Sequence, residues 1–187
     1  MVGLIEDLKH ITTANFKNIG DLIYVFGEDK EELGGSEFLK VIHNKVEGDA
    51  PQIDLQIEQN LHNTILSLIK DGFIESAHDI SEGGILSALA ECCIIDDENP
   101  IGAEANIPIK TREDFTLFSE SQSRIIVSVK AANKDLFEDK AAKLFTQFIQ
   151  IGETKKDKLT INDKFVFELS QLIEIYYKAI PLRMNEY

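Results

Sequence analysis

The stretch DLIYVFGED, residues 21–29, decides the fold of this chain, because it is the clearest buried strand in the sequence. Its apolar run from Leu22 to Phe26 is short and ends at Gly27. A short apolar run that is stopped by a glycine is typical of a strand inside a sheet. The other segments are therefore interpreted as the strands and helices that surround this one.

Further strands and helices alternate along the chain, which predicts a mixed α and β class with a sheet covered by helices. Further strands are expected at residues 73–79, 101–109, 124–129, 148–154, 158–163 and 165–170. Helices are expected after a Ser36 cap, over 54–71, over 84–95, from an Asn133 cap to 145, and over 168–181, where Pro181 ends the last one. Residues 111–123 look mixed and polar.

The main domain is expected to span residues 21–181, followed by a tail at 182–187. Residues 1–20 stand apart from the core pattern, and their apolar start, MVGLIED, has no nearby partner strand. We expect residues 1–20 to be the end of a preceding domain and a linker.

The charge of the chain argues against two classes of partner. Its 187 residues carry a net charge of −14, and an acidic surface repels both nucleic acids and anionic membranes. No apolar run approaches the ~20 residues of a membrane span. Cys92 and Cys93 fall in an apolar helical pattern, so we expect buried thiols and a reducing, cytoplasmic setting.

The motif AHDISEGG, residues 77–84, joins a predicted strand to a predicted helix. Gly83 and Gly84 lie where the helix begins, and the first N–H groups of a helix have no internal partner and favour an anion. Asp79 and Glu82 could hold a divalent cation that bridges to a phosphate. The motif therefore indicates a candidate site for a nucleotide or a phosphate.

Two other clusters carry candidate binding groups. FSESQSR, residues 118–124, precedes a buried strand, so its polar side chains could reach a ligand over the sheet edge. LGGSE, residues 33–37, precedes a helix and could bind an anion through backbone N–H groups. The candidate residues of the two clusters are Glu120, Ser121, Gln122, Gly34, Gly35 and Ser36.

Each cluster also has an ordinary structural interpretation. Ser81 or Asp79 could cap the helix that follows AHDISEGG, and His78 could be a structural hydrogen-bonding group. Arg124 could pair with an acid, and Ser36 could simply cap a helix after a flexible turn. Short motifs alone do not decide between these interpretations.

Taken in order, MVGLIEDLKHITTANFKNIGDLIYVFG, LGGSEF, SAHDISEGGILSALAE and FSESQSRIIVSV resemble the C-terminal part of the phosphoribosylformylglycinamidine synthase family. That family belongs to the aminoimidazole ribonucleotide synthetase-like superfamily. The resemblance covers nearly the whole chain. It implies an α+β fold (mixed α/β), in which helices pack on a mostly antiparallel or mixed sheet, and it implies that MVGLIEDL is the last strand of a preceding half.

The resemblance also implies an activity, that of the ATP-dependent ligase that converts formylglycinamide ribonucleotide to the amidine in purine biosynthesis. Ammonia would come from glutamine. The implied cofactors are ATP and Mg²⁺ for the full enzyme, with none certain for this chain. The implied partners are the N-terminal domains of the same synthetase, a glutaminase subunit and a small accessory subunit. The family's catalytic histidines and main magnesium ligands lie in the N-terminal halves, so we expect the isolated chain to be inactive.

The resemblance assigns the motifs to a nucleotide site. Glu120, Ser121 and Gln122 match a Glu-Ser-Gln motif that contacts substrate in the family's first C-terminal half. This chain resembles the second such half, which faces an auxiliary site that holds a structural nucleotide in some members. That site or its rim would include Asp79, Glu82, Gly83 and Gly84. Two alternatives are a scaffold domain that docks neighbouring domains, and a domain of another superfamily member such as aminoimidazole ribonucleotide synthetase.

Overall fold

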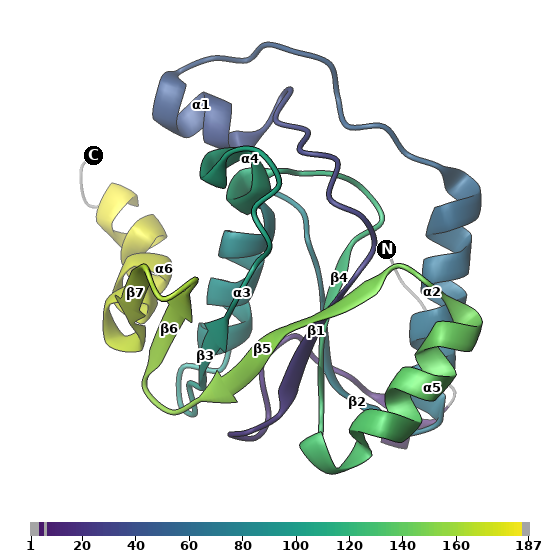
Figure 1. Ribbon diagram of the computed structural model, residues 1–187. Helices are drawn as coiled ribbons and strands as arrows, with labels where there is room; N and C mark the ends of the chain where they lie inside the picture. Colours follow the sequence, from purple (N-terminus) through teal and green to yellow (C-terminus); the bar gives the residue numbers. More distant parts are fainter. Residues whose placement is uncertain (1–3, 6, 185–187) are drawn as a thin grey trace.

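The computed structural model describes residues 4–5 and 7–184, and its strands form one twisted sheet (Figure 1). The sheet has seven strands in the order β2-β4-β1-β5-β3-β6-β7. Neighbouring strands are antiparallel, except that β3 and β6 are parallel. This confirms the expected mostly antiparallel, mixed sheet. The strands are β1 (Leu22–Phe26), β2 (Ile74–Asp79), β3 (Gly102–Ala105), β4 (Ile125–Val129), β5 (Phe148–Lys155), β6 (Lys158–Ile161) and β7 (Phe165–Glu168).

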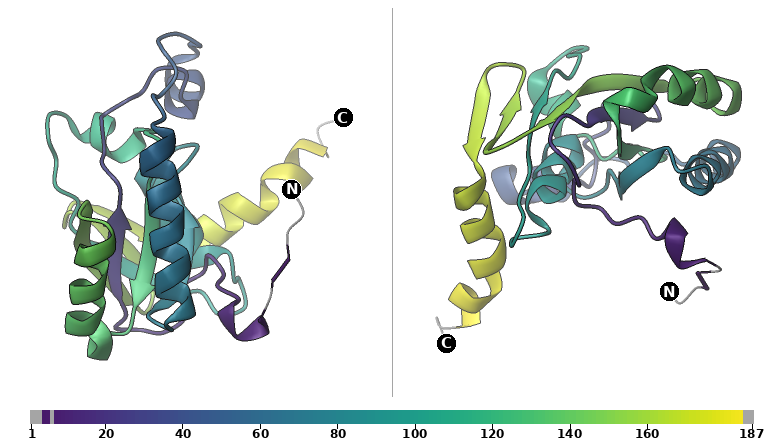
Figure 2. Two further views of the ribbon diagram at one scale, coloured as in Figure 1. Left: turned by 90° about the vertical axis from the view of Figure 1, so that its right-hand side faces the viewer. Right: turned by 90° about the horizontal axis from the view of Figure 1, so that it is seen from below.

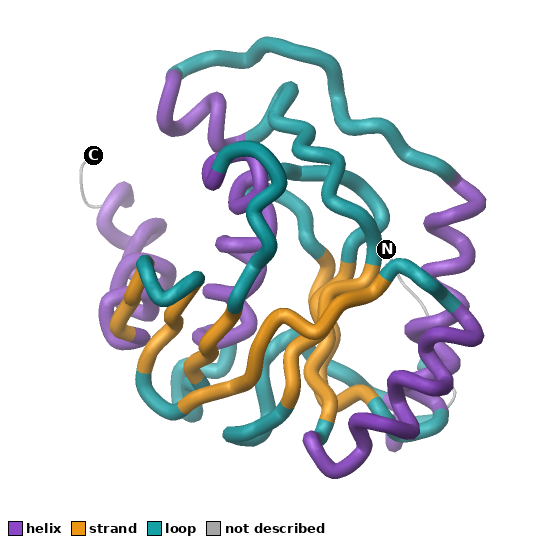
Figure 3. Tube along the Cα trace, viewed as in Figure 1, coloured by secondary structure: helices purple, strands orange, loops and turns teal. Residues whose placement is uncertain are grey.

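Helices surround the sheet, and Figure 3 distinguishes them from the strands by colour. The α-helices are α1 (Glu37–His43), α2 (Leu55–Lys70), α3 (Gly84–Ile94), α4 (Glu113–Phe118), α5 (Lys134–Leu144) and α6 (Leu169–Met184). Two short 3-10 helices, η1 (Leu8–His10) and η2 (Ala131–Asn133), complete the regular elements. All the expected helices are present, and α4 is an additional one.

The central strand β1 separates two hydrophobic cores. Ile23 and Val25 belong to the core under α3, whereas Leu22, Tyr24 and Phe26 belong to the core under α2 and α5. Successive side chains of a strand point to opposite faces, so a fully buried strand needs cover on both sides. In Figure 1, α2 and α5 lie together on one side of the sheet, and α3 lies on the other.

Two expectations from the sequence are wrong in detail, and a third is only partly confirmed. Helix α4 lies in the segment described as mixed and polar, where no helix was expected. Asn133 is the N-cap of α5, as predicted, but it makes no side-chain cap bond, because its backbone (φ −98°, ψ 3°) ends η2 instead of being extended. Helix α6 continues through Pro181 to Met184, because a proline near the end of a helix removes only one N–H donor there.

The segment before β1 lies against the sheet. Phe16 is buried in the α3 core, and its N–H donates to the Cys92 carbonyl at 2.9 Å. The Thr13 carbonyl accepts from Ala77 N–H on β2 at 3.2 Å. Figure 2 shows η1 and α6 extending away from the sheet on the same side. The strand expected at residues 1–7 lies partly outside the described residues, and the boundary at residue 20 stays a prediction.

The two cysteines are buried free thiols on α3, as predicted. Burial raises the pKa of both Cys92 and Cys93, so both thiols are neutral. Within the part of the chain that the structure describes, no helix has the length and apolar character needed to cross a membrane.

Helix α3 begins against α4 through a glycine. Gly84 has a left-handed backbone (φ 68°), and a methyl group there would lie 2.7 Å from the Leu117 carbonyl oxygen and 2.7 Å from Phe118 Cα. Only a residue without Cβ allows the two helices to approach this closely. Gly35 has a similar φ of 70° but has open space around its Cα.

We predict that Gly84→Ala destabilises the domain more than Gly35→Ala does. Both variants place a Cβ in the left-handed region, which costs about 1–2 kcal/mol. In Gly84→Ala the new Cβ also pushes α3 away from α4, which lowers the free energy of unfolding by roughly a further 1–3 kcal/mol. Urea denaturation of the two variants measures the difference. Equal losses would show that the contact with α4 is unimportant.

His78, at the end of β2, is a link between β2 and α3. Its Nδ1 lies 2.7 Å from the Asp79 carbonyl, and its Nε2 lies 3.1 Å from the Glu91 carboxylate on α3. Both partners are acceptors, so both ring nitrogens are satisfied only when both carry a proton. The hydrogen bond to Glu91 raises the pKa of His78 above its ordinary value, although burial opposes it. The structural role expected for His78 fits these contacts.

This linkage predicts that stability falls with rising pH. Because the pKa of His78 is higher in the folded state, its protonation adds to the free energy of unfolding. This contribution is complete below the pKa of His78 in the unfolded chain, about 6.5, and it is lost as the pH rises through the folded-state pKa. Urea denaturation at a series of pH values should show this loss. In Glu91→Gln and in His78→Gln, the free energy of unfolding should fall less steeply with pH than in the wild type. A pH profile like that of the wild type in both variants would contradict the prediction.

Candidate functional site

Glu120 joins the three sequence clusters at one corner of the domain. Its Oε1 accepts hydrogen bonds from Gly83 N–H at 2.8 Å and from Glu37 N–H at 2.9 Å. Gly83 precedes α3, and Glu37 is the first residue of α1. The motifs AHDISEGG, LGGSE and FSESQSR therefore meet at a single carboxylate.

The Glu120 carboxylate takes the position of an anion at the start of two helices. Unpaired N–H groups at a helix start favour a negative charge, and here the domain supplies that charge itself. Both hydrogen bonds go to Oε1, and Oε2 accepts none from the residues that the structure describes. Glu120 is half-buried. The corner thus fixes one carboxylate oxygen and leaves the other for a further donor.

The start of α3 differs from both expected caps. Gly83 is the N-cap, and its left-handed backbone (φ 79°) carries no side-chain cap bond. Ser81 uses its carbonyl to accept from Gly84 N–H at 3.0 Å, so capping by the side chain of Ser81 or Asp79 is wrong. Asp79 and Glu82 are exposed. Over residues 4–5 and 7–184, no group of three or more His, Cys, Asp or Glu residues could hold a metal ion.

The LGGSE segment is satisfied largely by its own neighbours. Gly35 N–H donates to the Glu47 carbonyl at 2.9 Å, and Ser36 N–H donates to the Leu33 carbonyl at 3.1 Å. The Ser36 hydroxyl accepts from Leu39 N–H at 3.3 Å, which confirms the predicted cap.

Gly34 lies against another stretch of backbone. A methyl group at Gly34 would lie 2.0 Å from the Asp49 carbonyl oxygen. Its lack of a side chain therefore serves packing within the domain.

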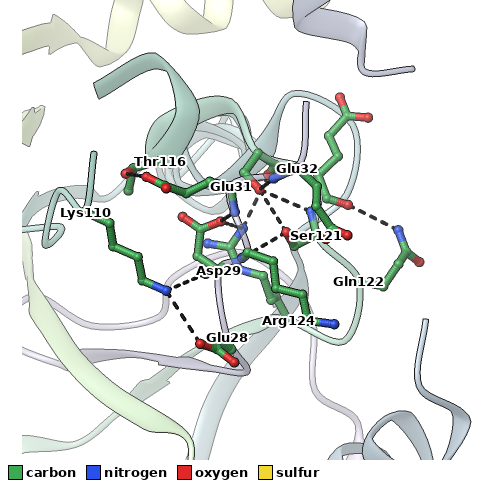
Figure 4. A network of polar contacts seen from close by, with 12 residues as sticks. Glu28, Asp29, Glu31, Glu32, Lys110, Thr116, Ser121, Gln122 and Arg124 are labelled. Atoms are coloured by element: carbon green, nitrogen blue, oxygen red, sulfur yellow. Dashed lines mark hydrogen bonds and ion pairs between the residues drawn. The ribbon is translucent and has the colours of Figure 1, made fainter. Parts of the chain in front are cut away.

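Ser121 and Gln122 of the Glu-Ser-Gln segment lie in different surroundings (Figure 4). Ser121 is buried, and its hydroxyl accepts from Lys30 N–H at 3.1 Å and lies 3.0 Å from the Ser119 hydroxyl. It stabilises the loop after β1. Gln122 is exposed, and its Nε2 donates to the Glu120 carbonyl at 3.2 Å. Only Glu120 and Gln122 are therefore placed to reach a ligand.

The acidic loop that follows β1 makes polar contacts that were not predicted from the sequence. Glu31 Oε1 accepts from the Thr111 hydroxyl at 2.9 Å. Lys110 donates to the Asp29 carbonyl at 2.5 Å (Figure 4). Arg124 is buried, and its guanidinium lies 3.9 Å from Asp29 Oδ1, which confirms that it pairs with an acid. Burial lowers the pKa of Arg124, although Asp29 opposes this. The run GEDKEE directly after a buried strand was the available signal.

Solved structures share this fold. Thermotoga maritima PurL complexed with FGAR has a TM-score of 0.67 and 19% identity, over 89% of this chain and 30% of that chain. T. maritima PurL complexed with ATP has a TM-score of 0.64 and 21% identity, over 89% of this chain and 28% of that chain. Thiamine-monophosphate kinase from Stenotrophomonas maltophilia K279a has a TM-score of 0.55 and 18% identity, over 81% of this chain and 52% of that chain. This chain thus spans less than a third of the length of the PurL chains.

The family comparison agrees with the fold and with the order of the motifs. The family model described as AIR synthase related protein, C-terminal domain, matches residues 18–164. The matched range includes β1, the Glu120 corner and every strand of the sheet except β7. The chain therefore belongs to the AIR synthase related protein family, as a C-terminal domain of that family.

Proposed function

We propose that this chain is the C-terminal domain of a phosphoribosylformylglycinamidine synthase and forms one wall of an auxiliary nucleotide site. The whole synthetase would convert formylglycinamide ribonucleotide to the amidine, with ATP and ammonia. The order of the sequence motifs, the family membership and the fold shared with T. maritima PurL support this proposal. The isolated chain would have no activity of its own.

The observation that carries the proposal is the Glu120 carboxylate held by two backbone N–H groups from different helices. With Oε1 fixed, Oε2 can accept from a hydroxyl group in a defined direction. A phosphate would meet a like charge here, whereas a ribose hydroxyl supplies the missing donor. Glu120 would thus bind the sugar of a nucleotide, and the exposed amide of Gln122 would offer a second polar contact.

In this proposal, the remaining candidate residues shape the wall. Gly83 holds Glu120 in place, Gly84 sets the approach of α4, and Ser36 fixes the start of α1. Asp79 and Glu82 form the exposed rim. ATP supplies the phosphoryl group in the full enzyme. The Mg²⁺ ligands would come from the N-terminal domains, because the described residues of this chain include no suitable cluster. A glutaminase and an accessory subunit would complete the assembly.

A second candidate function is a scaffold domain of the same enzyme. Helix α6 extends from the body of the domain (Figure 2), and several of its apolar side chains are exposed. Ile175 and Ile180 are 69% and 71% exposed, respectively. Exposed apolar patches of this kind mark contact surfaces. The two candidate functions differ in their predictions for Glu120. As part of a nucleotide site, Glu120 contributes to nucleotide affinity, whereas in a scaffold domain it does not.

We predict no turnover by the isolated chain. Formylglycinamide ribonucleotide, ATP, Mg²⁺ and ammonia should give no amidine above a control without protein. The physical reason is that the N-terminal domains, which would supply the rest of the site, are missing from this assay, and that no group of three or more His, Cys, Asp or Glu residues within 4–5 and 7–184 could hold the metal. Chromatographic detection of the product measures this, and turnover would overturn the proposal that the domain is only a part of the enzyme.

In the full-length synthetase that carries this domain, we predict that Glu120→Gln weakens nucleotide binding while the fold is kept. The glutamine oxygen can still accept from both N–H groups, but its NH₂ group replaces the free acceptor. Nucleotide affinity should fall roughly tenfold, which corresponds to about 1.4 kcal/mol. Isothermal titration with ATP and with formylglycinamide ribonucleotide measures it.

Two further variants separate binding from folding. Glu120→Ala leaves both N–H groups unpaired and should also lower the unfolding free energy by about 1–3 kcal/mol. Glu98→Gln removes an exposed acid beyond the other end of α3, outside the proposed site, and should change neither quantity. Wild-type nucleotide affinity in Glu120→Gln would favour the scaffold function.

A further inference from the structure

The segment 35–47, which contains α1, forms a loop that is closed on itself. Gly35 N–H donates to the Glu47 carbonyl at 2.9 Å, and this bond joins the two ends of the loop. The backbones touch at this neck, since a methyl group on Gly48 would lie 2.9 Å from Gly34 Cα. Loops of about 6–16 residues whose ends meet in this way are compact units and are frequently functional.

Contacts within the loop hold its shape. Lys45 N–H, after the end of α1, donates to the Leu39 carbonyl at 3.0 Å. The rings of Phe38 and His43 meet edge to face, with their centroids 5.3 Å apart. Because both partners of each contact belong to the loop, these contacts are kept when the loop moves as one body.

The loop is held to the body of the domain by a hydrogen bond and an aromatic stack. Glu37 N–H donates to Glu120 Oε1 at 2.9 Å, and the Phe38 ring stacks on the Phe118 ring with their centroids 4.5 Å apart. Among the described residues, Glu120 is the one hydrogen-bond partner that residues 37–46 have outside the loop.

Helix α1 contributes little to the core of the domain. It has no buried residue, and Figure 1 shows it beside α4 at the outer end of the domain, away from the sheet. A segment with few buried contacts opens at a lower free energy than the core does. The closed neck and the few outside contacts together describe a hinged unit.

We propose that residues 35–47 form a lid that opens as a unit about its neck, and that Glu120 Oε1 is the latch that holds the lid closed. The same oxygen accepts from Gly83 N–H at 2.8 Å, so the latch stays fixed to the body when the lid opens. A ligand hydroxyl on Oε2 leaves both bonds to Oε1 in place, and the closed lid and the ligand can therefore bind Glu120 together. That this ligand is a nucleotide rests on the proposed function, whereas the opening and its latch rest on the contacts of the loop alone.

Distances between two spin labels test the lid in the 187-residue chain. Cys92 and Cys93 are each 1% exposed, so the labels react only with introduced cysteines. Val41→Cys with Leu136→Cys links the lid to α5, and Leu136→Cys with Val166→Cys is a control pair within the body. These three side chains are at least 55% exposed. Double electron–electron resonance measures the distance distribution of each pair.

Glu120→Ala removes the latch. It should raise the ratio of open to closed lid by about tenfold or more, because a hydrogen bond to a charged acceptor is lost. The distance distribution of the lid pair should therefore shift, and that of the control pair should not. Glu120→Gln is the matched variant, since its oxygen still accepts from both N–H groups, and its distribution should be that of the wild type.

The outcomes separate the lid from the nucleotide site. An unchanged lid distance in Glu120→Ala, or an equal shift in Glu120→Gln, would overturn the latch, and a shift of the control pair would reject a change confined to the loop. If Glu120→Ala does not fold, Phe38→Ala decides, because it removes the stack on Phe118 and should shift the same distance; no shift would reject the lid. Wild-type nucleotide affinity in Glu120→Gln would contradict the proposed function and leave the lid unaffected.

Discussion

The burial of β1 on both faces is the constraint on which the rest of the structure depends. A strand whose five side chains are all buried must have apolar cover above and below. Helices α2 and α5 supply that cover on one face and α3 supplies it on the other, which divides the interior into two cores. Antiparallel neighbours β4 and β5 satisfy its backbone on both edges. Because β1 and β4 are antiparallel, the end of β1 lies beside the start of β4, which brings Asp29 to Arg124.

The same topology explains why polar groups gather at one end of the sheet. The loop after β1, the turn before α3 and the loop before β4 all lie at this end (Figure 1). Their backbone groups cannot pair within a sheet or a helix, so side chains must satisfy them. Glu120 and Ser121 do so for amides that are distant in sequence. Order in these loops therefore depends on side chains that also have the chemistry to contact a ligand.

Much of the fold could be predicted from the sequence, because the strands are short apolar runs and helices α2 and α3 have regular apolar spacing. Helix α4 was missed because its segment, TREDFTLF, has few apolar residues, and its packing against α3 and against Phe38 of α1 depends on contacts between segments that are distant in sequence. The three clusters of the site could be identified from their residue types, but not the contact between them. Glu120 and Glu37 are 83 residues apart, and only the completed sheet brings them together. Arg124 looked like an ordinary paired residue, but its Nε is buried without a hydrogen-bond partner among the described residues, which depends on packing that no local pattern reveals.

The satisfied amides of the Glu120 corner also constrain any nucleotide site built on it. The chain carries a net charge of −14, and three of its carboxylates, those of Glu120, Glu82 and Asp79, belong to this corner. Lys40 is already paired with Glu37 at 2.7 Å. The helix starts cannot attract a phosphate strongly while a carboxylate is bound to them. On the proposed function, the positive charge and the metal that hold the phosphates must therefore lie on another domain, and this domain contributes directed acceptors for the sugar.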